Sequence, residues 1–199
     1  MPLPLLIGGA PRSGKSRVAQ QLAAEWGVPQ ISTDTLRKQF REQYEAERES
    51  YPWLYSTEGM TAEEFWSTRT PQKVMELEIE QGRELWPFLI QVIKSGDYGI
   101  IEGVSLLPEL IWQTFGEHIR AVFLIDSNAD RVGQIIQREG LWGDADTYSD
   151  KVKKRELEWV MLHNKWFRQQ AKKYSYLLID RNEQSDKDGL ALIKSTLTR

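Results

Sequence analysis

The chain has 199 residues, of which 40% are hydrophobic and 28% are charged, and its formal net charge is −3. This balance is ordinary for a globular protein and lacks the overall positive charge expected of a nucleic-acid-binding surface. The absence of cysteine excludes disulfides, thiolate zinc sites and cysteine nucleophiles. Since no apolar stretch is long enough to cross a bilayer and no basic segment precedes the first apolar run, we expect a cytoplasmic protein without a signal peptide.

The first elements alternate between strand and helix. Residues 3–8 form a short apolar run that predicts a buried strand. Residues 15–26 place their apolar side chains on one stripe at helical spacing, and Gly27 then ends this helix. A second strand is predicted over residues 30–33, with Asp34 closing it.

A long polar region with helical periodicity follows, from residue 35 to residue 95. The segment Thr61-Ala62-Glu63-Glu64 has the spacing of a capping box. Thr70-Pro71 predicts a further helix start, and Pro87 inside that helix predicts a kink. We interpret residues 38–97 as a helical insertion within a single domain of residues 1–199, because the strands on both sides of it would pair in one sheet.

Three further strands are predicted at residues 98–102, 120–126 and 176–180. The fourth strand reads Ala-Val-Phe-Leu-Ile without interruption, which is typical of a strand buried on both faces of a parallel sheet. Strands that alternate with helices predict an α/β fold with helices on both sides of a five-stranded parallel sheet.

The first strand leads directly into the pattern G-x-x-x-x-G-K-[ST]. Its glycines allow backbone N–H groups to turn inward around phosphate oxygens, and the following helix adds its positive N-terminal end. Lys15 would neutralise the outer phosphates as a catalytic cation, and the Ser16 hydroxyl would bind Mg²⁺. We therefore predict binding of ATP or GTP with magnesium, the alternative being a degenerate loop that binds an anion or nothing. The predicted nucleotide-binding residues are Gly9, Ala10, Pro11, Arg12, Ser13, Gly14, Lys15, Ser16 and Arg17.

Two carboxylates at predicted strand ends are candidates for the magnesium and acceptor sites. Glu102 follows the third strand, where it would help to hold Mg²⁺ and contact the substrate; the alternative is a carboxylate with a structural role only. Asp34 would face the phosphates and orient or deprotonate the attacking hydroxyl; the alternative is a helix cap. Arg37 lies one helical turn further, where it would hold an anionic acceptor, unless it is simply solvated.

These segments together resemble the adenylate-kinase-like group of P-loop small-molecule kinases, and most closely the 2-phosphoglycerate kinase family. The resemblance includes the Gly-Gly start of the loop, Ser32-Thr33-Asp34 with Arg37, and Glu102-Gly103-Val104-Ser105-Leu106-Leu107-Pro108. The sequence departs from the family at Ser105, where the family has a histidine. It departs again at Pro11-Arg12, where a Ser-Gly pair is expected.

The resemblance implies the three-layer sandwich of P-loop NTPases with a short lid at residues 138–155. In this group, lid arginines stabilise charge on the phosphoryl group during transfer, which makes Arg138 a catalytic candidate and Arg155 a substrate-binding candidate. The alternative for both is a solvated charge on a helix.

The resulting functional prediction is an ATP- and Mg²⁺-dependent kinase. It would transfer the γ-phosphate to a small anionic acceptor, such as 2-phosphoglycerate or a similar metabolite. The alternatives are a nucleoside monophosphate kinase and a non-catalytic ATP-binding regulatory module. A nucleic-acid substrate is disfavoured by the net charge, and His163 is predicted to be a packed core residue.

Overall fold

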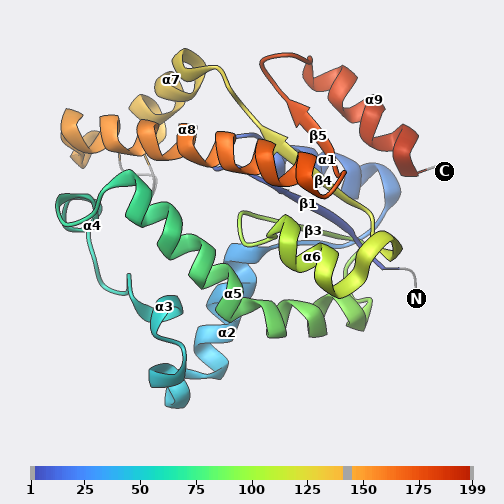
Figure 1. The fold of residues 1–199 in the computed structure, drawn as a ribbon, viewed down its shortest axis with the longest axis horizontal. Coiled ribbons are helices and arrows are strands. Elements are labelled where there is room, and N and C mark those ends of the chain that lie inside the picture. Colours follow the sequence, from blue (N-terminus) through green and yellow to red (C-terminus); the bar gives the residue numbers. More distant parts are fainter. Residues whose placement is uncertain (1–2, 141–144, 198–199) are drawn as a thin grey trace.

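The sheet has five parallel strands in the order β2-β3-β1-β4-β5. The computed structural model describes residues 3–140 and 145–197 (Figure 1). Each strand is one or two residues shorter than the sequence predicts, but all five lie where it expects them. Their bounds are β1 Leu5–Gly9, β2 Gln30–Ser32, β3 Ile100–Glu102, β4 Ala121–Ile125 and β5 Leu177–Asp180.

Helices lie on both faces of this sheet, as in the predicted three-layer sandwich (Figure 1). One apolar core joins the sheet to α1 and α9, and another joins its opposite face to α5, α6 and α8. The α-helices are α1 Lys15–Trp26, α2 Thr33–Gln43, α3 Pro52–Tyr55, α4 Ala62–Ser67, α5 Pro71–Ser95, α6 Pro108–Phe115, α7 Ala129–Glu139, α8 Asp150–Lys173 and α9 Asp186–Leu197. Short 3-10 turns span Glu45–Ser50, Gly116–His118 and Ala145–Thr147.

The segment between β2 and β3 is helical, as predicted. Thr61 and Glu64 form the expected capping box at the start of α4, and Thr70 caps α5. Helix α5 continues through Pro87, and its ribbon bends part-way along (Figure 1). The second half of α5 places Leu85, Leu89 and Ile93 in the core against the sheet. This helix therefore belongs to the layers of the domain as well as to the insertion.

The sequence prediction for Asp34 is wrong in its local structure. The second strand ends at Ser32, and α2 begins at Thr33. The Ser32 hydroxyl accepts a hydrogen bond from the Thr35 amide at 3.1 Å and so caps the helix. Asp34 consequently lies in the first turn of α2, and it neither closes the strand nor caps the helix.

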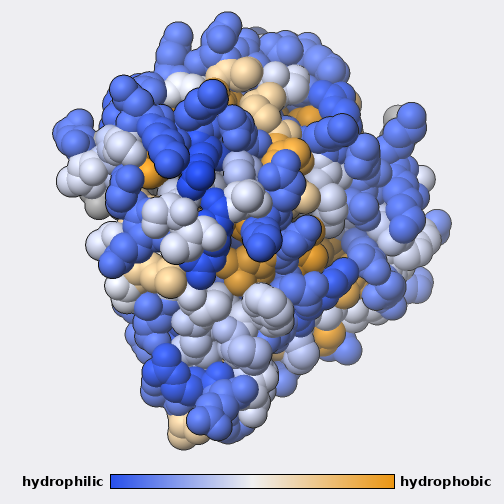
Figure 2. All heavy atoms as spheres, turned by 60° about the vertical axis from the view of Figure 1, so that its left-hand side comes forward, coloured by the Kyte–Doolittle hydropathy of each residue, from blue (hydrophilic) through white to orange (hydrophobic). Residues whose placement is uncertain are grey.

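The helix that follows β4 is α7, and α8 begins at Asp150. Part of the predicted lid tip, residues 141–144, lies outside the described residues. In the described part of the chain, no helix is long and apolar enough to span a membrane. The face in Figure 2 is mostly hydrophilic, with apolar residues visible mainly near its middle.

Candidate active site

The loop between β1 and α1 has the backbone geometry that the glycine pattern predicts. Arg12 and Gly14 adopt left-handed φ angles of 61° and 85°. A Cβ added at Gly9 would lie 1.9 Å from the carbonyl oxygen of Leu124, so the close approach of β4 requires glycine there. Within the described residues, no side chain caps the N-terminus of α1. The first-turn amides of this helix are thus available to an anion, which fits a phosphate-binding loop.

Lys15 is the first residue of α1, and its side chain reaches back to the loop with only 7% of its surface exposed. Its Nζ donates a hydrogen bond to the carbonyl oxygen of Ala10 at 2.6 Å. Burial lowers the pKa of Lys15, and the nearby carboxylates of Glu102 and Asp34 act in the opposite direction. The ammonium group is therefore poorly hydrated and held beside the phosphate-binding amides.

Ser16 and Glu102 meet at the carboxyl end of the sheet, as expected for a magnesium site. The Ser16 hydroxyl donates to Glu102 Oε1 at 2.9 Å. Burial raises the pKa of Glu102, and the charge of Lys15 opposes this shift. No cluster of three or more His, Asp or Glu side chains able to hold a metal occurs in the described part of the chain. A magnesium ion here would therefore need phosphate oxygens and water as further ligands, which is how P-loop proteins bind it.

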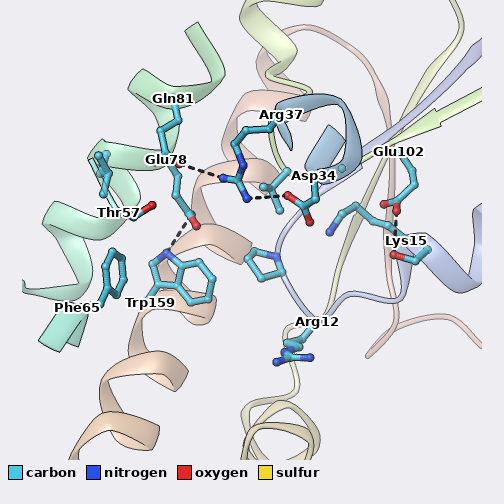
Figure 3. A pocket seen from close by; sticks show the side chains of 15 residues that line it. Arg12, Lys15, Asp34, Arg37, Thr57, Phe65, Glu78, Gln81, Glu102 and Trp159 are labelled. Atoms are coloured by element: carbon cyan, nitrogen blue, oxygen red, sulfur yellow. Dashed lines mark hydrogen bonds and ion pairs between the residues drawn. The ribbon is translucent and has the colours of Figure 1, made fainter. Parts of the chain in front are cut away.

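A cavity of about 330 Å³ extends from this loop to α4, α5 and α8. Figure 3 shows Lys15 and Glu102 on one side of it and Glu78 and Trp159 on the other. Asp34 and Arg37 line the same cavity from α2. The fold thus brings the predicted phosphate loop and the predicted acceptor residues to one hollow.

Asp34 and Arg37 share one face of α2, as their spacing predicts. Arg37 Nη2 lies 3.1 Å from Asp34 Oδ1, and Arg37 Nη1 donates to Gln81 Oε1 at 3.2 Å. The Asp34 side chain is 71% exposed, whereas that of Arg37 is 28% exposed. Arg37 is therefore oriented from two sides, and Asp34 is open to an incoming molecule.

The far wall of the cavity, which α5 and α8 form opposite the loop, contains functional candidates that the sequence did not predict. Trp159 Nε1 donates to Glu78 Oε2 at 3.1 Å, and His163 Nε2 lies 3.2 Å from the same oxygen. Burial raises the pKa of Glu78 to about 8 and lowers that of His163 to about 3. His163 is buried, as predicted, but its contact with Glu78 was not. In the sequence, Gln81 interrupts the apolar stripe between Leu77 and Leu85, which indicates a polar group on the buried face of this helix but does not identify its partners; in the structure it is 4% exposed.

Several arginines lie elsewhere than the predictions suggest. Arg138 is 73% exposed and pairs with Glu139, and Arg155 donates to the carbonyl of Trp66. Neither lines the cavity in this structure. Arg17 points away from the loop to pair with Asp186 of α9.

Arg12 is the arginine that reaches the cavity from the loop side. Its Nη1 donates to Glu139 Oε2 at 3.1 Å, and its Nη2 lies 3.7 Å from Glu156 Oε1. These contacts connect the phosphate loop to the end of α7 and to α8. Arg12 was predicted to bind the nucleotide, and in this structure it pairs with carboxylates.

A buried carboxylate at the carboxyl end of β4 holds two arginines beside the loop. Asp126, which is fully buried after β4, binds Arg131 through two contacts of 2.7 Å. Arg181 Nη1 lies 3.8 Å from the same carboxylate. An added Cβ at Gly14 would lie 3.2 Å from Arg181 Nη1, so this arginine packs directly against the loop.

Comparison with known proteins places this geometry in context. No family model matches the chain. An adenylate kinase of Clavibacter michiganensis subsp. michiganensis is 25% identical over 158 residues, which cover 78% of this chain and 74% of that protein. Together with the intact loop, this similarity supports a P-loop kinase.

Two solved structures align with nearly the whole chain. TT1252 from Thermus thermophilus superposes with a TM-score of 0.53 at 19% identity, over 99% of this chain and 97% of that chain. A shikimate kinase from Bacteroides thetaiotaomicron has a TM-score of 0.49 at 13% identity, over 98% and 96% of the two chains. The likeness to the Thermus protein confirms the predicted α/β fold with its parallel sheet.

Proposed function

We propose that the chain is a kinase that uses Mg-ATP to phosphorylate a hydroxyl group of a small anionic molecule. The observation that carries this proposal is the shared cavity, in which Lys15 and the Ser16–Glu102 pair face Asp34 and Arg37. Phosphoryl transfer needs little more from a protein than positioning and charge stabilisation. Both are supplied by the side chains around this hollow.

The loop side binds the nucleotide in this proposal. The amides at the start of α1 hold the phosphates, and Lys15 exchanges the Ala10 carbonyl for phosphate oxygens. Ser16 and Glu102 hold Mg²⁺ directly or through water. When bound, the magnesium ion neutralises charge on the transferred phosphate.

The α2 side handles the acceptor. The exposed carboxylate of Asp34 accepts the proton of the acceptor hydroxyl, and its contact with Arg37 at 3.1 Å fixes its direction. Arg37 can also donate to an anionic group of the acceptor, such as a 2-phosphoglycerate-like acid. Arg138 and Arg155, which do not line the cavity here, are proposed to contact the transferred phosphate only when substrates are bound.

The similarity to an adenylate kinase favours a nucleoside monophosphate as a second candidate acceptor. The two candidates differ in what the far wall must contact, since a nucleoside requires room and partners for a base. An acceptor screen decides between them directly.

The test is a transfer assay with γ-labelled ATP and Mg²⁺ against hydroxy acids, sugars, sugar phosphates and nucleoside monophosphates. We expect one acceptor class to become labelled, and Asp34→Asn to reduce that transfer by about 10²–10⁴-fold while Mg-ATP binding persists. The exposed Glu42→Gln on the same helix is the matched control and should leave transfer unchanged. Absence of transfer to every class would contradict the proposal.

A further inference from the structure

Glu78 is the acidic group on the cavity wall opposite the P-loop, and the proposed nucleotide chemistry does not use it. It projects from α5, and its side chain is 22% exposed. Figure 3 shows its carboxyl group turned towards Trp159, in the space that Arg37 and Asp34 also face. Its charged neighbours are Arg37 and Asp34 from α2 and Lys15 from the loop, while α8 presents His163.

The surroundings of the His163 ring indicate its tautomer. Among the described residues, His163 Nδ1 is buried without a partner, while Nε2 lies 3.2 Å from Glu78 Oε2. A buried N–H without an acceptor is rarer and more unfavourable than a nitrogen lone pair without a donor. Burial also keeps the pKa of His163 at about 3, so the ring is neutral. We therefore place its single proton on Nε2, the nitrogen that faces Glu78 Oε2.

This arrangement determines which oxygen of Glu78 carries a proton. Oε2 accepts the N–H bond of Trp159 and lies 3.2 Å from His163 Nε2, so we place a proton on this carboxyl group at Oε1. Among the described residues, none forms a hydrogen bond with Oε1, and Glu78 lines the cavity. Because burial raises the pKa of Glu78 to about 8, the proton is present at neutral pH. The far wall thus offers a neutral O–H donor to a ligand.

We propose that the acceptor is a hydroxy acid whose carboxylate is held by the Arg37 guanidinium and the Glu78 O–H group, with its hydroxyl at Asp34. Both proposed partners donate hydrogen bonds, so they select an anionic oxygen and disfavour an amine. Arg37 supplies one positive charge and already contacts Asp34 at 3.1 Å. A singly charged carboxylate suits this balance better than a doubly charged phosphate, which would also be repelled by Asp34.

Trp159 acts as a positioning residue, since its N–H bond engages Glu78 Oε2 and leaves Oε1 for the ligand, while His163 lies beside the same oxygen. Because the inference rests on the proposed kinase function, its test must separate the two. The measurements are kcat and the acceptor KM between pH 6 and pH 9 for hydroxy acids and for matched amino alcohols. The variants are Glu78→Gln, Glu78→Leu and the exposed control Glu80→Gln, which pairs with Arg83 on the outside of α5.

For the wild type, we expect the KM for hydroxy acids to rise about tenfold per pH unit above pH 8, as Glu78 ionises. Glu78→Gln keeps an uncharged donor, so its KM should be only a few-fold higher at pH 7 and should lack this alkaline rise. Glu78→Leu should raise KM more than tenfold at every pH with a smaller effect on kcat. Thermal unfolding of each variant checks the fold, and Glu78→Gln alone suffices if the leucine variant does not fold.

Two results would overturn the inference while leaving the kinase intact. One is preferred transfer to amino alcohols that strengthens as pH rises, which would mean that ionised Glu78 binds a cation. The other is a hydroxy-acid KM with the same pH profile in the wild type and in Glu78→Gln. Absence of transfer by the wild type to any acceptor would instead contradict the proposed function itself.

Discussion

The two sides of the cavity are built in different ways. The loop side consists of one continuous turn between β1 and α1, where backbone amides and one ammonium group face the cavity. The far wall joins α5 to α8, and its hydrogen bond from Trp159 to Glu78 spans 81 positions in sequence. The loop side can bind any phosphate chain, whereas the far wall depends on the protonation states of Glu78 and His163. Nucleotide handling and acceptor choice should therefore be separable by mutation.

Of the changes that compare the two sides, the largest effect is expected from a substitution on the loop side. Lys15→Ala removes the ammonium that would stabilise charge on the transferred phosphate, so we expect transfer to fall on the order of 10²–10³-fold. The steady-state rate with γ-labelled ATP measures this. Lys38→Ala, which removes an exposed lysine from α2, is the control. Wild-type rates in Lys15→Ala would show that the loop does not perform the assigned chemistry.

A second change tests the joint between β3 and α2, on which both sides depend. Gly103 has a φ angle of 150°, and an added Cβ would lie 1.8 Å from Thr33 Oγ1. Gly103→Ala should therefore lower the free energy of unfolding by about 1–3 kcal/mol, measured by urea denaturation. Gly133→Ala, where the nearest atom would be 3.7 Å away, should cause no loss. Equal stability of the two variants would disprove the tight packing at this joint.

The protonation of the far wall predicts a pH dependence of stability. The folded-state pKa of Glu78 is raised to about 8 from its ordinary 4.5, so the folded protein retains a proton that the unfolded chain loses. Stability should therefore fall as pH rises from 4.5 to 8. His163, with its pKa lowered to about 3 from 6.5, acts in the opposite direction below pH 6.5.

Between pH 6.5 and pH 8 only Glu78 of this pair contributes, with a slope of at most about 1.4 kcal/mol per pH unit. Chemical denaturation at several pH values measures this slope. In Glu78→Gln the decline over this interval should be smaller than in the wild type. An identical slope in both proteins would mean that Glu78 is already ionised in the folded protein over this whole pH interval.

The smallest expected effect concerns the orientation of Glu78. Trp159→Phe keeps an aromatic ring at this buried position but removes the N–H donated to Oε2 together with part of the indole, so it should lower stability by about 1–2 kcal/mol. Trp112→Phe, at a site 39% exposed, should change stability by less than about 0.5 kcal/mol. Mg-ATP affinity should be unchanged in both. A loss of nucleotide affinity in Trp159→Phe would show that the two sides are not independent.

The sequence predicted those parts of the site that depend on short-range signals. Short strand-like runs between the helical segments identified the five strands, and the spacing of Gly9, Gly14 and Lys15 identified the loop. Asp34 and Arg37 were correctly placed on one face because three positions separate them on a helix. Asp34 was nevertheless misplaced in its local structure, since the hydroxyl of Ser32, two positions earlier, caps α2.

The far wall could not be predicted because it depends on how distant helices pack. Glu78 and His163 each look like one polar residue on a helix, and only the approach of α5 to α8 brings them within 3.2 Å. The same holds for Arg12, whose partner Glu139 lies at the end of α7. The periodicity of a helix shows which face is buried, but it does not show which other helix covers that face.

The central claim is that the loop at residues 9–16 binds the triphosphate of a nucleotide with magnesium. Calorimetric titration of the wild type and Lys15→Ala with Mg-ATP tests it most directly. We predict saturable one-to-one binding to the wild type and at least tenfold weaker binding to the variant. No binding of Mg-ATP or Mg-GTP to the folded wild type, or equal affinity in the two proteins, would contradict the claim.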